Sequence, residues 1–465
     1  MLQPNINKWH ILAIAMAGSI PSTLDSSMLG VSLPSIASEF STDIGTTQWV
    51  ISIYRLIIVS LLLTFGRLGD MLGHRRIFMW GLLAFSIASI FAGLSQNIGM
   101  LIAFRVPQGI AAAMKMAVGH AIIAQAFPPA ERGKAFGFQL ASIGLTTAIG
   151  PALGGIVTEF LGWRSIFAID VVIAMSTFFV ARRVRAFSLE TTRAKGQTFD
   201  RTGASSLFLF LLSLLLLVNR GPAWGWGSIP VLALWVSIFL WAALFIRTER
   251  RVPQPVISLS IFTIRAFSLG NTAAFLAFTA QHILLFLTPF YLQMVLHLTP
   301  KTVGLTVIAL SVSFLVFSPL SGTLSDRIGT RRLTFIGPVI SAVALFLMSQ
   351  LGADSTPFDS AWRLALFGLG MAVFQSPNNS AIMASIPPAH LGVGSSMINM
   401  SRNMGWLMGT VLGAAVLFAL LPTFESMQQE TALFLQALKN AYLIGAVFSG
   451  LAALATLVPR GKKPS

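Results

Sequence analysis

The chain has 465 residues, of which 55% are hydrophobic and only 10% are charged, and its formal net charge is +16. A soluble domain carries about 25% charged residues, so this chain has too few charges to cover a surface that faces water. It contains no cysteine, which excludes disulfides, thiol catalysis and cysteine metal sites. The composition therefore predicts a polytopic membrane protein.

Apolar runs of about 17–25 residues, long enough to cross a bilayer, recur along the chain. The predicted helices lie at about 9–31, 46–65, 77–95, 99–124, 136–158, 164–181, 203–219, 229–246, 268–296, 302–321, 333–351, 361–386, 394–420 and 436–458. The first run follows a single basic residue, Lys8, and shows no small-residue cleavage site, so we interpret it as a retained span. The sequence predicts an all-α membrane protein with 14 transmembrane helices.

The basic residues indicate which ends of these helices face the cytoplasm. With the N-terminus inside, 22 of the 31 lysines and arginines fall in cytoplasmic segments and 5 fall on the opposite side. Short cytoplasmic loops are enriched in such residues, so both termini are predicted to be cytoplasmic. The positive charge then contacts anionic membrane lipids, and no nucleic acid partner is expected. The longest loop, about 182–202, is basic and is expected to lie along the cytoplasmic face.

One short segment occurs twice. GRLGDMLGHRR at Gly66–Arg76 recurs as GTLSDRIGTRR at Gly322–Arg332, with a constant offset of 256 residues. The matched residues are Gly66, Leu68, Asp70, Gly73, Arg75 and Arg76 in the first copy and Gly322, Leu324, Asp326, Gly329, Arg331 and Arg332 in the second. Each copy follows the second helix of a six-helix set if helices seven and eight are set apart. This predicts a 6 + 2 + 6 architecture, as in many secondary transporters, divided into residues 1–187, 188–265 and 266–465.

Five segments in order resemble motifs of the major facilitator superfamily, and more narrowly of its 14-spanner drug:proton antiporter branch. They are LDSSMLGVSLPSI (Leu24–Ile36), GRLGDMLGHRR (Gly66–Arg76), FRVPQGIAAA (Phe104–Ala113), GLTTAIGPALGG (Gly144–Gly155) and GWRSIFAID (Gly162–Asp170). The resemblance implies a proton-coupled antiporter that exports lipophilic drug-like compounds by alternating access. It implies a monomer in a bacterial cytoplasmic membrane, with the proton gradient as energy source and no cofactor.

Other functions stay open at this point. The same fold also serves carriers of a specific metabolite, siderophore or lipid-like compound, and a sensor or scaffold built on a transport fold is a further class. An enzyme is not predicted, because the sequence shows no metal-ligand spacing and no pairing of a nucleophile with a base.

Ionisable residues inside predicted spans are the first candidates for a functional site, because charge within a bilayer is unfavourable. Asp25, Arg55, Arg105 and Asp170 all fall in the outer half of the membrane at a rise of about 1.5 Å per residue, so they could form one cluster. We hypothesise that Asp25 is the main proton-coupling carboxylate. The alternative is a permanent ion pair of Asp25 with Arg105 or Arg55 that only holds helices together.

The remaining intramembrane candidates each have two interpretations. Asp170 takes a direct role or serves helix packing, and Arg105 resembles a motif arginine that assists proton transfer or is a structural charge partner. Arg55 is a counter-ion for the first carboxylate or favours an anionic or zwitterionic substrate. Lys115 lines a cavity or extends toward the headgroups, and His282 titrates near neutral pH or makes a fixed hydrogen bond.

The repeated segment is hypothesised to be a latch that closes the cytoplasmic side. Its glycines allow a tight turn between helices, and Asp70 can lie near a helix N-terminus, where a negative charge is favourable. Arg75 and Arg76 can bond to nearby carboxylates or carbonyls. The second copy has Ser325 and Thr330 at the positions of Gly69 and His74 in the first, so the Gly66–Arg76 copy is expected to be the stronger latch.

The fifth predicted helix carries the residues of the resembling antiporter motif. These are Gly144, Gly150, Pro151, Gly154 and Gly155. Glycines let helices approach closely and proline distorts a helix. The motif is therefore expected to seal this helix against a neighbour during gating, with simple close packing as the alternative.

Overall fold

The computed structural model describes residues 8–42, 44–184, 199–225, 227–252, 259–421 and 430–457. Within these ranges the chain is helical and contains no strand. Residues 185–198 of the predicted basic loop lie outside the described residues, as does the basic segment at the C-terminus.

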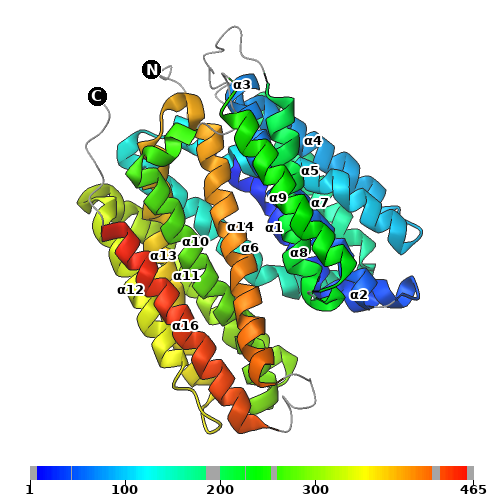
Figure 1. Cartoon of the computed structure of the whole chain (residues 1–465), viewed down its shortest axis with the longest axis vertical. Coiled ribbons are helices and arrows are strands. Elements are labelled where there is room, and N and C mark those ends of the chain that lie inside the picture. The colour runs from blue at the N-terminus through cyan, green and yellow to red at the C-terminus, as the bar shows by residue number, and fades with distance from the viewer. Residues whose placement is uncertain are drawn as a thin grey trace. The chain divides into compact units, whose positions relative to one another are not determined.

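Fourteen long helices are present among the described residues, and each coincides with one of the 14 predicted from the sequence (Figure 1). The first seven are α1 (Lys8–Glu39), α3 (Trp49–Leu72), α4 (His74–Gly93), α5 (Ile98–Ala126), α6 (Arg132–Leu161), α7 (Arg164–Arg183) and α8 (Arg201–Trp224). The other seven are α9 (Ile229–Glu249), α10 (Arg265–Phe290), α11 (Pro300–Ile328), α12 (Thr330–Met348), α13 (Pro357–Ser385), α14 (Leu391–Leu420) and α16 (Thr431–Leu457). Short turns are α2 (Ile44–Thr47), η1 (Pro129–Glu131), η3 (Leu259–Thr263), the π-helix η4 (Tyr291–Val295) and η5 (Pro388–His390).

Ten of the long helices are sufficiently long and apolar in their described residues to cross a membrane. The four that fall outside this set are α1, α8, α13 and α14. The structure thus confirms an all-helical membrane protein, while the 14-span topology remains a prediction.

The chain divides into two compact units. Unit 1 comprises Met1–Phe127, Ile149–Thr263 and Ile386–Met400, and unit 2 comprises Pro128–Ala148, Ile264–Ser385 and Ser401–Ser465. Two helices are shared, because α6 begins in unit 2 and ends in unit 1, whereas α14 begins in unit 1 and ends in unit 2. Each unit therefore includes the first part of a helix that continues into the other.

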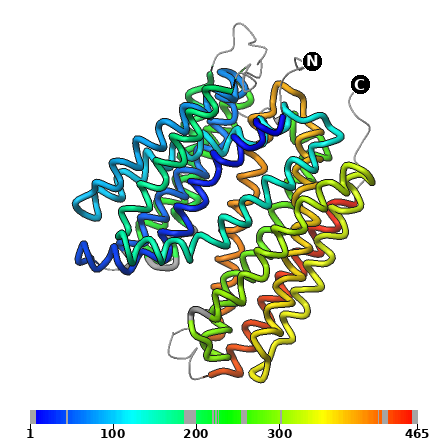
Figure 2. The backbone as a smooth tube through the Cα atoms, turned by 180° about the vertical axis from the view of Figure 1, so that it is seen from behind, coloured from blue at the N-terminus to red at the C-terminus, as the bar shows by residue number. Residues whose placement is uncertain are grey.

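Helix pairing in unit 1 is repeated in unit 2. In unit 1, α5 packs against α1, α3 and α4, and α7 packs against α1 and α4. In unit 2, α13 packs against α10, α11 and α12, and α16 packs against α10 and α12 (Figures 1 and 2). The sequence repeat at an offset of 256 residues thus extends to packing, with α1, α3, α4, α5 and α7 matching α10, α11, α12, α13 and α16. The α8–α9 pair has no counterpart in this scheme and packs through α8 on α3.

The repeated segment is helical on both sides of a turn of one residue. In the first copy, Gly66 to Leu72 form the last turns of α3, and His74 already begins α4. Only Gly73 lies between the helices, with φ of 101°, and Gly329 does the same in the second copy with φ of 87°. Such angles are strained for any residue with a Cβ atom, so one glycine suffices for the turn and the rest of each copy is helical.

Candidate functional site

A buried ion pair joins two helices of unit 1. Arg105 Nη1 in α5 donates to Asp25 Oδ1 in α1 at 2.8 Å, and both side chains are completely buried. Arg105 Nε also donates to the backbone oxygen of Val50 at 2.8 Å, and the guanidinium carbon lies 4.0 Å from the centre of the Tyr54 ring. These contacts hold the guanidinium toward one oxygen of Asp25. The other oxygen, Oδ2, is buried and has no hydrogen-bond partner within the described residues.

Gln108 links this ion pair to a second buried carboxylate. Its Oε1 accepts a hydrogen bond from Arg105 Nη1 at 2.6 Å, and its Nε2 donates to Ser89 Oγ at 2.9 Å. The same Nε2 lies 3.5 Å from Asp170 Oδ2 in α7, and Asp170 also interacts electrostatically with Asp25. A single amide therefore touches both parts of the network, and the two carboxylates are neighbours.

Lys115 is a third charged group within reach of these carboxylates. Its Nζ atom lies 3.6 Å from the centre of the Phe85 ring and has no hydrogen-bond partner within the described residues. A desolvated ammonium over an aromatic face gains about 2 kcal/mol or more. The charge of Lys115 also acts on Asp170 and Asp25, so the buried network balances several charges of both signs.

The four residues expected to cluster in the outer half of the membrane come together in part. Asp25, Arg105 and Asp170 share the network described above. Arg55 stays exposed and forms no ion pair within the described part of the chain, although its charge acts on Asp25. Arg105, and not Arg55, is therefore the bonded partner of Asp25.

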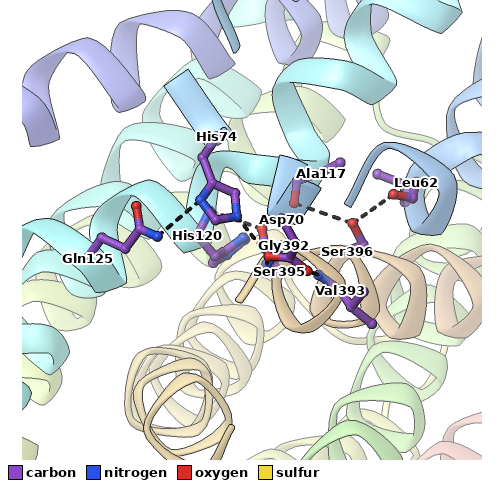
Figure 3. A network of polar contacts seen from close by, with 10 residues as sticks. All are labelled: Leu62, Asp70, His74, Ala117, His120, Gln125, Gly392, Val393, Ser395 and Ser396. Carbon is purple, nitrogen blue, oxygen red and sulfur yellow. Dashed lines mark hydrogen bonds and ion pairs between the residues drawn. The ribbon is translucent and has the colours of Figure 1, made fainter. Parts of the chain in front are cut away.

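The Asp70 carboxylate lies at the N-terminus of α14. Its Oδ1 accepts a hydrogen bond from the backbone N–H of Gly392 at 2.6 Å, and its Oδ2 accepts one from Val393 at 3.1 Å (Figure 3). These N–H groups have no partner inside their own helix, and an anion there is favoured by the helix dipole. Asp70 therefore caps a helix that lies more than 300 residues further along the chain. We call this contact the α14 cap.

Close backbone packing accompanies the α14 cap. A Cβ atom on Gly392 would lie 2.2 Å from the backbone oxygen of Gly66, so no larger residue fits between α3 and α14. Ser396, one turn further along α14, donates from Oγ to the backbone oxygen of Leu62 at 2.7 Å. The first turns of α14 are thus held to α3 both by charge and by backbone contact.

The second copy builds the same contact in unit 2. Asp326 accepts hydrogen bonds from the backbone N–H groups of Gly133 and Lys134 at the start of α6, each at 2.9 Å. A Cβ atom on Gly322 would lie 2.2 Å from the backbone oxygen of Gly133. We call this contact the α6 cap. It reproduces the α14 cap at both carboxylate oxygens and in the pair of facing glycines.

The arginines of the two copies have individual surroundings. Arg331 Nη2 donates to the backbone oxygen of Leu457 at the end of α16, at 2.8 Å. The contacts with the capped helices described above are made by the carboxylates and the glycines.

Two glycines of the predicted antiporter motif lie against α1. A Cβ atom on Gly150 would lie 2.3 Å from Ser27 Cβ, and one on Gly154 would lie 2.6 Å from Met28 Cα. The second part of α6 therefore packs on α1 so closely that side chains at these two positions are excluded.

The other residues of that motif are less confined. A Cβ atom on Gly144 would lie 3.0 Å from Phe314 within unit 2, and one on Gly155 would meet nothing closer than Val31 at 4.0 Å. Pro151 lies inside α6 and does not interrupt the helix. Among the four glycines of the motif, Gly150 and Gly154 approach α1 most closely.

His282 belongs to a different cluster, in unit 2. Its ring stacks on Trp406 of α14 with 5.2 Å between ring centres, and the Arg402 guanidinium lies 5.4 Å from the Trp406 ring. On the same helix as His282, the backbone oxygen of Gly270 accepts a hydrogen bond from Asn378 at 3.0 Å. These groups belong to unit 2, whereas Asp25, Arg105 and Asp170 belong to unit 1.

Sequence reasoning did not single out several residues that the structure places in these sites. Gln108 was visible as part of the quoted FRVPQGIAAA segment, and His74 was visible as a difference between the two copies. Gln125, Gly392 and Val393 offered no signal, because their role depends on helices that meet only in the fold. No group of three or more His, Asp or Glu side chains suited to a metal occurs among the described residues.

The sequence profile of the Major Facilitator Superfamily matches residues 15–410. The chain belongs to this superfamily. Its family and fold are those of integral membrane transporters that carry small molecules, and no family of enzymes is indicated.

Individual relatives span nearly the whole chain. It is 32% identical over 441 residues to the riboflavin transporter RibZ of Clostridioides difficile (strain 630), covering 94% of each protein. It is 30% identical over 407 residues to the tetracenomycin C resistance and export protein of Streptomyces glaucescens, covering 87% of this chain and 75% of that protein. The human organic anion transporter MFSD10 (TETRAN) shares the fold with a TM-score of 0.67 at 14% identity, covering 98% of this chain and 100% of that one.

Proposed function

We propose that the chain is a proton-coupled antiporter that exports lipophilic drug-like compounds by alternating access. The observation that carries the proposal is the fully buried Asp25–Arg105 pair, linked through Gln108 to Asp170, in a member of a transporter superfamily. Ionisable groups held inside a membrane protein serve ion or substrate pathways in most cases. The named function of the Streptomyces glaucescens relative supports export.

The proposal includes an arrangement in the membrane. It places the chain in a bacterial cytoplasmic membrane as a monomer in contact with lipids, with 14 spans and both termini in the cytoplasm. The repeated helix pairing of the two units supports the 6 + 2 + 6 scheme of the 14-spanner drug:proton branch. The proton gradient is the energy source.

In this proposal Asp25 is the group that gains and loses the proton. Its Oδ1 is occupied by Arg105, whereas the buried Oδ2 has no hydrogen-bond partner within the described residues. A proton can therefore be added at Oδ2 without displacing an existing donor. Neutralising Asp25 weakens its attraction to Arg105, and this change at the α1–α5 contact is the signal that couples protons to rocking.

The α14 cap and the α6 cap are the proposed cytoplasmic latch. Each cap holds the first turn of α14 or α6 by charge and by close packing. Both helices continue into the other unit. A latch at this point closes the cytoplasmic side while the carrier faces outward and breaks when it opens inward.

A second candidate is a carrier of a specific metabolite. The similarity to a riboflavin transporter covers 94% of both chains and supports it. Exposed Arg55 offers a positive charge to an anionic or zwitterionic compound. A sensor or scaffold is a third class, and it is distinguished by the absence of coupled flux.

Proton flux in proteoliposomes tests the proposal. The purified chain is reconstituted with an internal pH dye and is given pulses of ethidium, a lipophilic cation, or riboflavin. Ethidium-driven proton movement is expected in the native chain and none in Asp25→Asn, because the amide cannot carry the proton. Proton movement driven by riboflavin but not by ethidium would favour the metabolite carrier. If neither compound drives proton movement, both the drug exporter and the metabolite carrier are contradicted.

Glu39→Gln is the matched control. Glu39 pairs with Arg164 in the same unit, but both side chains are partly exposed, so its loss is expected to leave coupling unchanged. Removing one partner of a buried pair destabilises a protein by about 3–5 kcal/mol, so equal amounts of monodisperse protein are compared. Native coupling in Asp25→Asn would make the Asp25–Arg105 pair a structural contact only.

A further inference from the structure

The side chain of His74 contacts the Asp70 carboxylate of the α14 cap. It is the first residue of α4, and its side chain is 2% exposed. Its Nε2 atom lies 3.0 Å from Asp70 Oδ1, and its Nδ1 atom lies 3.1 Å from Nε2 of Gln125 in α5 (Figure 3). A chain of contacts thus runs from Gln125 through His74 and Asp70 to the N–H of Gly392.

The two contacts of the imidazole match its neutral form when the amide nitrogen of Gln125 faces Nδ1. The amide nitrogen of Gln125 can only donate, so Nδ1 of His74 accepts and carries no proton. The proton of the neutral ring is then on Nε2, which donates to Asp70. In this arrangement Gln125 Oε1 is buried and has no hydrogen-bond partner within the described residues. Rotating the amide by half a turn would present that oxygen to Nδ1, which is what a doubly protonated, charged ring requires.

We propose that His74 is the positioning residue of the α14 cap, and that its protonation from the cytoplasm loosens the cap. The inference rests on the latch described under Proposed function. Neutral His74 orients Asp70 so that both oxygens reach the N–H groups of α14, while the carboxylate keeps its full negative charge. Gln125 then serves as the switchable partner of the ring, donating to the neutral form and accepting from the charged form.

Electrostatics sets the direction of the effect. The N-terminus of a helix acts as about half a positive charge, and Asp70 binds it as an anion. A positive imidazole at 3.0 Å from Asp70 Oδ1 offsets that anion and repels the helix terminus. Acidification of the cytoplasm is therefore expected to weaken the cap, and a rise in pH to strengthen it.

Other charged groups surround the same site and must be separated from His74. Asp70 and Arg67 lie on α3, His120 lies on α5 and His390 lies on η5, while Arg75 and Arg76 directly follow His74 in α4. Burial lowers the pKa of the His390 imidazole, with Asp70 opposing this and Arg67 adding to it. His390 therefore stays neutral until the pH falls further than an ordinary histidine requires. The variants His120→Gln and His390→Gln serve as controls for these two rings.

The absence of cysteine in the chain allows a direct measurement of cap opening. Val393→Cys places a thiol on a side chain that is 1% exposed, while the backbone N–H that bonds Asp70 is retained. Its rate of reaction with a maleimide in detergent reports opening without substrate or gradient. Rates are compared between variants at the same pH, because thiol reactivity itself depends on pH.

Two substitutions imitate the two forms of the ring. His74→Gln keeps a neutral donor, whereas His74→Arg carries a permanent positive charge. Maleimide labelling of Val393→Cys is therefore expected to be about fivefold to thirtyfold faster in the arginine variant at every pH, the ratio that corresponds to about 1–2 kcal/mol. The native chain should match His74→Gln near pH 8 and His74→Arg near pH 5.5. Equal rates for the two variants, or an unchanged pH response in His74→Gln, would overturn the proposal.

Gln125→Glu provides an independent test that leaves His74 in place. A carboxylate facing Nδ1 favours the charged ring, so the pH at which labelling accelerates is expected to rise by about one unit. An unchanged midpoint contradicts the role of Gln125. Asp70→Asn tests the latch itself: fast labelling at all pH values supports it. Slow labelling in Asp70→Asn would contradict the latch hypothesis, and with it the role of His74. The proton-flux assay tests transport independently of this result.

Discussion

The two copies of the repeated segment cap a helix in the same way, but the residues next to the capping carboxylate differ between them. Asp70 and Asp326 each cap the first turn of a helix, and in each copy a glycine pair brings the backbones together. Behind Asp70 lies His74, whereas the second copy has Thr330 at that position. Ser325, which replaces Gly69, donates to the backbone oxygen of Gly322 in its own helix at 2.8 Å, and its Oγ lies 2.3 Å from the place that a Cβ atom on Gly133 of the capped helix would take. The helix cap needs only a carboxylate and a glycine pair, so the residue next to the carboxylate can differ between the copies. A histidine at that position can make the cap of one copy respond to pH.

The largest effect is expected from filling the glycine contact. Gly392→Ala and Gly322→Ala place a Cβ atom 2.2 Å from a backbone oxygen of the facing helix. Overpacking of this kind destabilises by about 1–3 kcal/mol, which corresponds to roughly a 5- to 150-fold loss of the closed state. Maleimide labelling of Val393→Cys, combined with the transport rate, measures it for Gly392→Ala.

Gly304→Ala in α11 is the matched control. Nothing lies within 4 Å of the Cβ atom that it would add, and alanine is a better helix former than glycine by about 1 kcal/mol. The control should transport normally. Normal transport in Gly392→Ala as well would show that transport does not require close packing of α3 against α14.

A smaller effect is expected from removing the charge of each cap. Asp70→Asn and Asp326→Asn retain an oxygen that can accept a hydrogen bond but lose the attraction to the helix N-terminus. The expected weakening is about 1–2 kcal/mol for each, and it is larger for Asp70 because its contact with His74 changes too. Uptake and efflux rates at matched expression compare the two variants. A greater loss in Asp326→Asn would reverse the predicted order of the two latches.

The smallest effect is expected from adding a histidine to the second copy. The position 256 residues after Gln125 is Ala381, so Thr330→His by itself gains no amide partner. We expect Thr330→His with Ala381→Gln to make the α6 cap open about twofold to fivefold faster in acid than at neutral pH, and Thr330→His alone to do less. A thiol at buried Ala135 of α6 reports this cap. No pH response in the double variant would mean that the histidine acts only in the setting of the first copy.

Much of the helical framework follows from apolar runs. All 14 predicted runs are helices, because a segment in lipid must satisfy its own backbone hydrogen bonds. The helix ends predicted on either side of Gly66–Arg76 were wrong, since hydropathy marks where a span ends and does not mark where its helix ends. The helix α3 continues to Leu72 because only Gly73 has the backbone angle that breaks it.

The candidate site was less accessible to sequence reasoning. Asp25, Arg105 and Asp170 stand out because charge is rare in spans, and their proximity followed from estimated depth. Depth does not decide which side of a helix faces a neighbour, so the choice of Arg105 over Arg55 as the partner of Asp25 came from packing. Gln108 was not predicted as a site residue, because its amide is uncharged and only charged residues stand out within a span.

The sequence by itself determined that this is a helical membrane transporter with a repeated segment, since composition, apolar length and an exact offset are properties of the chain in one dimension. Only the tertiary structure decided what Asp70 and Asp326 bind. Their partners are backbone N–H groups, which every residue except proline carries and which no sequence pattern distinguishes. Only the fold brings the first turns of α14 and α6 to the two carboxylates, and only the fold places His74 and Gln125 behind one of them.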